Sequence, residues 1–456
     1  MKRFTFLIFV FASIFLTSCS TVNTEPNVTS ETYRSSTDVI SEPPVNEEGF
    51  LTKGGDRVSA ETVEKYPQLT ALPTLYLEFE SPGGLSDVEH GVYSDATYTF
   101  VDGDPMSSYY NLPLKIKGRG NYSWSLMQKP YTLKLDKKAD LAGMGKAKKW
   151  ILVTVNSDKT MLRNYITQKC AKWLGLPGTC DNEFVDVVAD GKYIGTYVLT
   201  EKIEIGENRI EADKRLSSLF EIEMVYRHTC NFCIVMYTNK NDPGRSVHLS
   251  LKSYHGKKPD ELTVAERRTV RDEYEEFFKN VESAMKSGSV EELGKYIDTD
   301  SFVNWYLLNE LTRNLDSMFV TSCYCFIDES GKLFMGPCWD YDTCYGAQIG
   351  ESEGAWVRQA PWFDWLFEYN EPFKALCSKR WLELRRENNN IADWFSINMD
   401  AAIAQIAQSE KMEHELYPHS EFTDLEFDDA VIYMKQWLHR RFKWMDREFL
   451  PPLSQR

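Results

Sequence analysis

The 456-residue sequence has almost no long apolar runs. Its mean hydropathy is −0.43, and residues 4–16 form the one segment apolar enough to meet a bilayer. A protein with several membrane spans is therefore excluded. The chain also lacks an excess of positive charge, because 52 Lys and Arg stand against 68 Asp and Glu, giving a net charge of −16. Non-specific nucleic-acid binding needs clustered cations, so we expect no nucleic-acid partner.

Histidine is scarce, with seven residues, and the spacing of half a zinc site occurs once, at Cys230 and Cys233. No second pair follows at a suitable distance, so we do not expect a structural zinc ion. Nine cysteines remain beyond Cys19, an odd number. We expect at least one thiol that is unpaired or intermolecular, with the rest as buried thiols or disulfides. Hydrophobic residues make up 42% of the chain, which is enough for a folded core.

The N-terminus carries an export signal. Lys2 and Arg3 precede the apolar residues 4–16, and this core is too short for a spanning helix. Residues 16–19 read LTSC, which resembles the bacterial lipobox. We expect residues 1–18 to be a lipoprotein signal peptide and Cys19 to be acylated, so that the exported protein is anchored to a membrane, periplasmic or at the cell surface. The alternative is an ordinary cleaved signal with an incidental Cys.

The rest of the chain has strand patterns first and helix patterns later. The polar composition of residues 20–48 predicts that residues 19–70 comprise the lipidated Cys and a flexible tether. Period-two alternation predicts a strand-rich N-lobe over 71–254, and helical spacing predicts a helix-rich C-lobe over 255–450. We therefore expect an α+β fold in two lobes. The expected strands lie at 75–80, 98–101, 114–117, 131–136, 150–155, 184–188 and 193–199, the expected helices at 161–174, 264–287, 290–297 and 299–312, and a hairpin at 324–335.

The order of a few residues along the chain suits phosphoryl transfer, which needs positioning and charge neutralisation. Gly118 and Gly120 lie in a turn between two strands, where backbone N–H groups can approach phosphate oxygens. Lys134 lies on the returning strand, Asp316 follows a helix and Asp340 follows the hairpin. Each signal alone also fits a turn, a solvated strand face or a helix end. Their joint order favours a kinase-like site.

The chain contains six distinctive motifs, which read KGRGNYSW at 117–124, KPYTLKL at 129–135, KKWIL at 148–152, MLRN at 161–164, GTYVLTEK at 195–202 and GPCWDYD at 336–342. In this order they resemble the spore coat protein H (CotH) kinase family over residues 72–450. The resemblance implies an atypical protein-kinase-like fold. It also implies transfer of the terminal phosphoryl group of ATP to Ser or Thr of a protein substrate, with Mg²⁺ (or Mn²⁺).

The resemblance also implies roles for individual residues. Gly118, Arg119 and Gly120 correspond to the phosphate-facing loop, and Lys134 to the phosphate-binding lysine. Asp316, in the motif ELTRNLD, corresponds to the catalytic carboxylate that orients or deprotonates the substrate hydroxyl. The metal ligands implied are Asp340 and, second in line, Asp342.

The sequence departs from ordinary kinases in the carboxylate that fixes the phosphate-binding lysine. That carboxylate usually lies on a helix, but the helix expected at 161–174 has no acidic residue. Glu201, Glu221 or Glu223, on or beside strands, would have to replace it; we assign Glu201 to the nucleotide site.

Two further positions are ambiguous. No Asn follows Asp316 as a second metal ligand, so we expect either a single metal ion or Asp342 as the extra ligand. Arg163 has two interpretations, a structural tie to a carboxylate between the lobes or a phosphate contact.

A different class of function also fits the sequence. Free ATP is scarce outside the cytosol, so the chain could instead be a catalytically silent surface lipoprotein that binds proteins or carbohydrates as a scaffold. Its 12 Trp, 24 Tyr and 25 Phe would suit such contacts, although most of them are expected in the core. A glycosidase is disfavoured because no pair of acids is singled out by its spacing.

Overall fold

Strands dominate the first half of the chain and helices the second in the computed structural model, which describes residues 49–223, 232–236, 246–347, 352, 354, 357–420 and 423–450, apart from the side chain of residue 389. The part from Glu47 onwards belongs to one compact unit. The predicted signal peptide, Cys19 and most of the tether lie outside the described residues. None of the helices in the described ranges is long and apolar enough to cross a bilayer.

Seven strands close into a barrel in the order β3-β4-β5-β6-β7-β9-β8. Most neighbours are antiparallel hairpins, and the barrel closes because β3 pairs in parallel with β8. Alternate residues point inward, so Leu133, Trp150 and Leu152 are fully buried while Lys134 and Lys149 point outward. The strands are β3 (Thr74–Glu78), β4 (Ser94–Val101), β5 (Tyr109–Gly118), β6 (Tyr131–Asp140), β7 (Lys146–Thr154), β8 (Asn182–Ala189) and β9 (Lys192–Glu201).

A second sheet has five strands in the order β11-β12-β10-β13-β14. Its central strand β10 pairs antiparallel with both β12 and β13. The hairpin expected at 324–335 therefore joins a sheet whose other strands all precede residue 255. Because the lobe boundary was predicted between residues 254 and 255, this sheet contains strands from both predicted lobes. The strands are β10 (Ser218–Glu223), β11 (Cys233–Met236), β12 (Val247–Tyr254), β13 (Cys323–Ile327) and β14 (Leu333–Met335).

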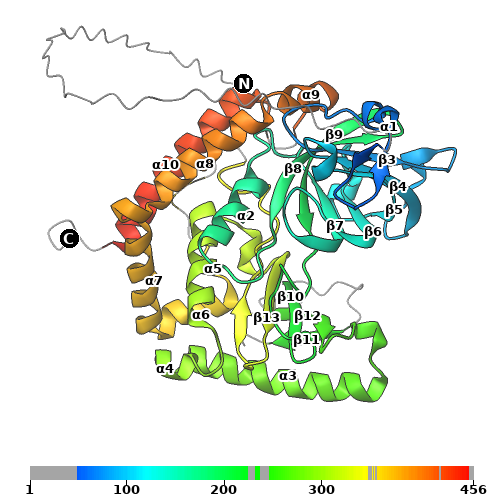
Figure 1. The fold of residues 1–456 in the computed structure, drawn as a ribbon. Coiled ribbons are helices and arrows are strands. Elements are labelled where there is room, and N and C mark those ends of the chain that lie inside the picture. Colours follow the sequence, from blue (N-terminus) through cyan, green and yellow to red (C-terminus); the bar gives the residue numbers. More distant parts are fainter. Residues whose placement is uncertain are drawn as a thin grey trace, which may run out of the picture. The chain divides into compact units, whose positions relative to one another are not determined.

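The helices pack around a shared apolar core. In Figure 1, α2 and α5 lie in the middle of the molecule. The two sheets lie on one side of them, and α7, α8 and α10 lie on the other side. Capping explains where several begin: Thr263 and Glu266 form a reciprocal capping box at α3, and Asp298 caps α5. The bounds are α1 (Ala60–Lys65), α2 (Arg163–Trp173), α3 (Val264–Met285), α4 (Val290–Leu293), α5 (Thr299–Thr312), α6 (Pro361–Tyr369), α7 (Glu371–Leu384), α8 (Ile391–Ile406), α9 (Ser409–Leu416) and α10 (Phe427–Phe449), with two short strands, β1 (Phe50–Leu51) and β2 (Arg57–Val58).

One buried ion pair joins three segments of the helical region. Arg441 of α10 contacts the Glu310 carboxylate of α5 at 2.6 Å, and both side chains are fully buried. The same carboxylate accepts hydrogen bonds from the backbone N–H groups of Val357 and Arg358. Glu310 therefore fixes the end of α5, the segment at 357–358 and α10 relative to one another.

The α+β class is confirmed, and the expected strands and helices fall on observed elements. The two-lobed, kinase-like arrangement stays a prediction, and the strand-rich region is a closed barrel together with part of a second sheet. Among the cysteines that the structure describes, seven are buried and none of these seven forms a disulfide: Cys170, Cys180, Cys323, Cys325, Cys338, Cys344 and Cys377. Cys230 lies outside the described residues.

A buried acid docks α9 on the barrel. Glu413 is 1% exposed, and its Oε2 accepts a hydrogen bond from the backbone N–H of Thr196 in β9 at 2.6 Å. Burial, together with the charge of Asp186 in β8, raises the pKa of Glu413 to about 8. Tyr193 and Tyr417 also face this group.

This burial predicts how stability depends on pH. The unfolded chain ionises Glu413 near its ordinary pKa of 4.5, whereas the folded protein keeps the proton up to about pH 8. The free energy of unfolding should therefore fall as the pH rises between these values, by up to about 1 kcal/mol per pH unit for this one group. Glu413→Gln should make the slope shallower in urea denaturation at pH 5, 6.5 and 8. The exposed Glu415→Gln on the same helix is the control; equal slopes in the two variants would contradict the assignment.

Candidate functional site

Two of the predicted metal ligands lie in the segment that follows β14. Asp340 has a left-handed backbone, with φ of 70°, and its Oδ2 accepts a hydrogen bond from Ser322 at 3.0 Å. Asp342 accepts a hydrogen bond from Ser157 at 3.3 Å. Ser157 lies in the segment after β7, so Asp342 lies where this segment of the barrel meets the segment that follows the second sheet.

The first turns of α2 hold this segment in place. Arg163 donates from Nε to the carbonyl oxygen of Cys344 at 2.8 Å, and the Asn164 side chain accepts from the backbone N–H of Tyr341 at 2.6 Å. One turn further on, Thr167 and the Tyr345 hydroxyl are 2.6 Å apart. Three side chains of one helix thus fix the backbone on both sides of Asp342.

Arg163 is a structural tie in this structure. It is 4% exposed, and its Nη1 forms a buried ion pair with Asp158. Asp158 lies in the segment between β7 and α2, and it also accepts hydrogen bonds from Thr160. The guanidinium therefore links that segment to the one carrying Asp342, which is the first of the two interpretations of Arg163.

Four carboxylates share one electrostatic neighbourhood. Burial and the negative charges of Asp340, Asp158 and Asp316 together raise the pKa of Asp342 to about 8. Burial also raises the pKa of Asp340, partly offset by the Ser322 hydrogen bond and the charge of Arg119. The structure thus brings Asp316 into the neighbourhood of Asp340 and Asp342, from which it is remote in the sequence. Asp158 was not predicted as part of this group.

Asp316 reaches this neighbourhood because α5 ends abruptly. The helix stops at Arg313 in a left-handed conformation, with φ of 53°. A short turn follows in which the Asn314 side chain accepts a hydrogen bond from the Asp316 backbone N–H at 3.1 Å. Asp316 then begins a single 3₁₀ turn and is half-buried.

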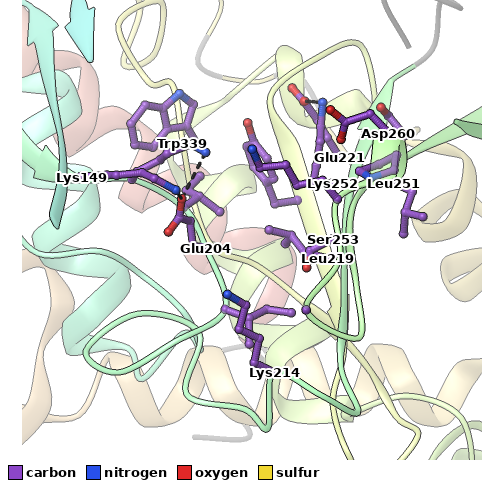
Figure 2. A pocket seen from close by; sticks show the side chains of 18 of the residues that line it. Lys149, Glu204, Lys214, Leu219, Glu221, Leu251, Lys252, Ser253, Asp260 and Trp339 are labelled. Carbon is purple, nitrogen blue, oxygen red and sulfur yellow. Dashed lines mark hydrogen bonds and ion pairs between the residues drawn. The ribbon is translucent and has the colours of Figure 1, made fainter. Parts of the chain in front are cut away.

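A cavity of about 640 Å³ lies between the outer face of the barrel and the second sheet. Figure 2 shows Lys149, Glu204 and Trp339 on one side of it and Glu221 and Lys252 on the other. Apolar side chains that include Ile151, Ile203, Ile205, Leu219 and Leu251 complete the wall. The cavity is thus partly apolar and partly strongly charged, as sites for charged ligands with a flat apolar part are.

Arg119 connects this cavity with the acidic segment. It lines the cavity, and its guanidinium lies over the Trp339 ring at 5.3 Å. Trp339 immediately precedes Asp340, whose pKa Arg119 lowers. Among the predicted nucleotide-binding residues, Arg119 is the one found in the cavity wall formed by the described residues.

The two predicted glycines have local structural roles. A side chain at Gly118 would meet the Trp124 ring, since a Cβ there would lie 2.4 Å from it. Gly120 has φ of 85°, a conformation that favours glycine, and a Cβ there would lie 2.2 Å from the Ser123 hydroxyl. The close packing of this turn accounts for both glycines, and neither is in the cavity wall.

Lys134 and Glu201 do not meet each other. Lys134 lies on the outer face of β6, with its ammonium 5.8 Å from the centre of the Tyr93 ring, and is outside the cavity wall. Glu201 is fully buried, opposite the inward-facing Trp150, and contacts Arg209 at 3.4 Å. Burial raises the pKa of Glu201 to about 7, against the lowering effect of Arg209.

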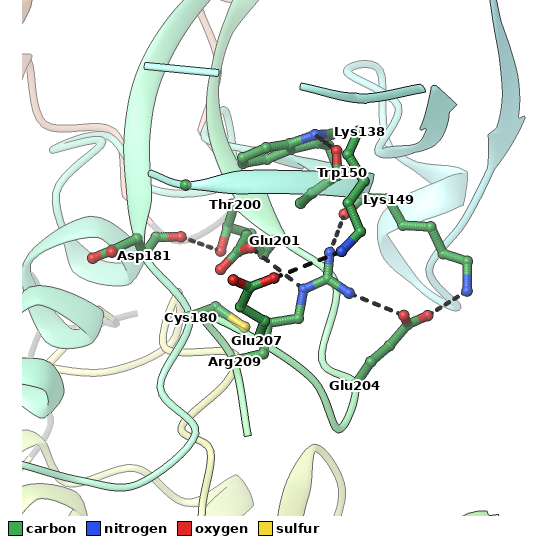
Figure 3. Close-up of polar contacts among 12 residues, drawn as sticks. Lys138, Lys149, Trp150, Cys180, Asp181, Thr200, Glu201, Glu204, Glu207 and Arg209 are labelled. Carbon is green, nitrogen blue, oxygen red and sulfur yellow. Dashed lines mark hydrogen bonds and ion pairs between the residues drawn. The ribbon is translucent and has the colours of Figure 1, made fainter. Parts of the chain in front are cut away.

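The sequence analysis missed the lysines that line the cavity, which are Lys149, Lys202, Lys214, Lys252 and Lys258. Lys149 of β7 contacts Glu204 at 2.5 Å, and Lys202 contacts the same carboxylate at 3.3 Å. Figure 3 shows Arg209 between Glu204 and Glu201. The signal for two of them was present in the motifs at 148–152 and 195–202, which contain Lys149 and Lys202.

The oxygen atoms of Asp340 and Asp342 are of the type that binds magnesium in proteins. Nowhere in the described ranges do three or more His, Cys, Asp or Glu side chains form a group arranged to hold a metal ion. Magnesium, however, is usually held by one or two carboxylates together with phosphate oxygens and water. Asp340 and Asp342 offer oxygen donors only. The raised pKa of Asp342 reflects burial first and then neighbouring negative charge, and a cation would neutralise that charge. The pair therefore fits such an ion.

The chain belongs to the CotH kinase protein family. The family's sequence profile matches residues 116–445, which includes most of the barrel, the second sheet and the helices up to α10. A search of curated proteins finds no match to the chain. The resemblance inferred from the motifs is thus confirmed at the level of the family, and a kinase-like function follows at that level.

The tie made by Arg163 predicts a large loss of stability on its removal. Arg163→Met leaves the buried Asp158 without its cation, so the free energy of unfolding should fall by about 3–5 kcal/mol. Lys169→Met on the same helix breaks a half-exposed ion pair with Glu183 and should cost less than about 1 kcal/mol. Urea denaturation of both variants measures the difference. Losses of similar size would show that Arg163 does not fix the two segments.

Proposed function

We propose that the protein is an ATP-dependent kinase of the CotH family that transfers the terminal phosphoryl group to a Ser or Thr hydroxyl of a protein substrate. The observation that carries this proposal is the meeting of Asp316, Asp340 and Asp342 in one electrostatic neighbourhood. Arg119, which acts on Asp340, also lines the cavity, whose wall carries cations and carboxylates. A volume of about 640 Å³ lies within the range of 300–1,000 Å³ that is usual for small-molecule sites.

Each charged group has a role that its position supports. Asp316 would accept a hydrogen bond from the substrate hydroxyl and take its proton as the new phosphorus–oxygen bond forms and the bond between the terminal phosphorus and the departing ADP breaks. Asp340 and Asp342 would hold Mg²⁺ (or Mn²⁺), and Arg119 would offset negative charge on the phosphates. The bound ion would supply charge neutralisation across the phosphate oxygens.

The electrostatics favour this function over a silent scaffold. Burial and neighbouring negative charge both raise the pKa of Asp342, so its charged form is disfavoured in the protein alone. A scaffold protein does not need a buried carboxylate such as Asp342. In a site for a cation and phosphates, the cation would stabilise the charged form of this carboxylate. The scaffold remains an outcome of the experiment below.

The proposal predicts different effects for two substitutions. ATP with Mg²⁺ should raise the Tm of the wild-type protein, and Asp340→Ala should abolish this shift because it removes a metal ligand. Asp316→Asn should keep the shift but lower phosphate transfer to a Ser-rich peptide by about 10²–10⁴-fold, as expected for the loss of a general base.

Asp300→Asn is the matched control for these variants. Asp300 lies exposed in the first turn of α5, the helix that leads to Asp316. It should retain both the shift and the transfer rate. If the wild-type protein shows no Tm shift at millimolar ATP, or transfers phosphate no faster than Asp316→Asn, the kinase proposal is wrong and a scaffold is favoured.

We also propose that the mature protein is anchored to a membrane through lipid on Cys19. Support comes from the short apolar core at residues 4–16 and the LTSC motif that ends at Cys19. Cys19→Ala should move the protein from the membrane fraction to the soluble fraction after cell lysis, whereas Ser20→Ala should not. Unchanged fractionation of Cys19→Ala would refute lipid anchoring.

A further inference from the structure

Four lysines lie side by side across four neighbouring strands of the barrel. The strand register pairs Lys115 of β5 with Lys134 of β6, and Lys134 with Lys149 of β7. Lys202 follows β9 by one residue, and its backbone N–H donates to the Lys149 carbonyl at 3.3 Å. Like charges directly opposite each other destabilise a sheet. A row of four is therefore a cost that folding alone does not explain.

Carboxylates neutralise only part of this row. At one end Lys115 contacts Asp95 at 2.6 Å. At the other end, Lys149 and Lys202 share the single carboxylate of Glu204, at 2.5 and 3.3 Å. Arg209 contacts the same carboxylate at 2.9 Å. Arg209 also contacts the buried carboxylate of Glu201 at 3.4 Å, so three cations meet two anions and one positive charge remains in excess at this end of the row.

That excess faces the cavity. Lys149, Lys202 and Glu204 line it, while Lys115 and Lys134 do not. Burial lowers the pKa of Lys202, the charge of Glu204 opposes this shift, and the charges of Lys149 and Lys117 add to it. The lysines thus repel one another inside a partly enclosed space, and an anion placed among them would relieve this repulsion.

Glu204 and Arg209 hold Lys149 in place. Arg209 donates from Nη2 to the Lys149 carbonyl at 3.3 Å, so it contacts both the backbone of Lys149 and the carboxylate that binds its ammonium. Figure 3 shows this arrangement. A strand lysine fixed by a carboxylate from another segment is the arrangement by which kinases hold nucleotide phosphates.

We propose that Lys149 and Lys202, positioned by Glu204, form the polyphosphate-binding site of this cavity, in place of Lys134 and Glu201. The ligand class is the polyphosphate chain of a nucleoside triphosphate, and this identification rests on the proposed function. The positively charged site itself rests on the register and contacts given above. Glu204 and Arg209 are positioning residues, since they act through Lys149.

The test is binding of inorganic tripolyphosphate, without metal, to the full mature chain by isothermal titration calorimetry. Lys149→Met and Lys202→Met should each weaken binding by about tenfold or more, because each removes a charge-assisted contact to phosphate. Lys115→Met, at the far end of the same row, should change affinity by less than twofold. Lys149→Arg should retain most of the affinity, which shows that charge at this position matters and that the fold tolerates substitution.

Three results would overturn the inference. The first is that the wild-type protein does not bind tripolyphosphate at millimolar concentration. The second is that Lys134→Met loses as much affinity for tripolyphosphate as Lys149→Met, and the third is that Lys115→Met and Lys149→Met bind it with equal affinity when circular dichroism shows both to be folded.

Measurement of ATP-dependent phosphate transfer separates this inference from the proposed function. If tripolyphosphate binding depends on Lys149 but the wild-type protein transfers no phosphate, the binding site stands and the kinase proposal fails. If Lys149→Met and Lys202→Met both transfer phosphate at the wild-type rate with an unchanged KM for ATP, the kinase proposal stands and this inference fails.

Discussion

The candidate site depends on how the segment after β14 docks on the first turns of α2. Arg163, Asn164 and Thr167 each contact the backbone or a side chain between Tyr341 and Tyr345. Because α2 follows the barrel strand β7, these contacts fix Asp342 relative to the barrel as well as to the second sheet. Without them the acidic residues would lie on a segment held mainly by its own turns. The low exposure of Arg163 makes the tie strong, since an ion pair away from water cannot exchange its partner for solvent at little cost.

The same principle applies to the other end of the acidic neighbourhood. Glu310 lies in the last turns of α5, six residues before Asp316, and its carboxylate binds Arg441 and the backbone at 357–358. The end of α5 is therefore anchored in the core, and the left-handed residue Arg313 turns the chain toward Asp342. One buried ion pair, Arg163–Asp158, thus helps to fix the segment with Asp340 and Asp342, and another, Arg441–Glu310, fixes the end of α5 that precedes Asp316.

Much of the fold could be predicted from local patterns. Period-two alternation indicated the barrel strands, and the Asp190-Gly191 turn joins β8 and β9 as its sequence suggests. The closure of the barrel could not be predicted, because the parallel pairing of β3 with β8 joins strands about a hundred residues apart and leaves no local signal. For the same reason the sheet that combines β10–β12 with the hairpin β13–β14 was not foreseen.

The carboxylates of the site were easier to predict than its cations. Asp340 and Asp342 follow a recognisable hairpin, so their order along the chain was informative. The choice between Lys134 and Lys149 depends on which part of the outer barrel face meets the second sheet, and that is a property of tertiary structure alone. Gly118 and Gly120 suggested a phosphate loop, but the packing of Trp124 and Ser123 explains them.

The groups that lack a full set of partners in this region are of opposite types at its two ends. Lys149 and Lys202 share one carboxylate on the barrel side, and after β14 Asp340 and Asp342 lie close together, where burial and neighbouring carboxylates disfavour the charged form of Asp342 in the protein alone. Arg119 lies over Trp339 and acts on Asp340, so it joins the two. Direct ion pairs between the lysines and these aspartates would stabilise both groups without a ligand. In the described residues, however, Lys149 and Lys202 pair with Glu204 and not with Asp340 or Asp342. A phosphate chain with a bound divalent cation presents both signs in one ligand. It would offset both ends at once, which is the physical reason to place the nucleotide across this region rather than beside Lys134.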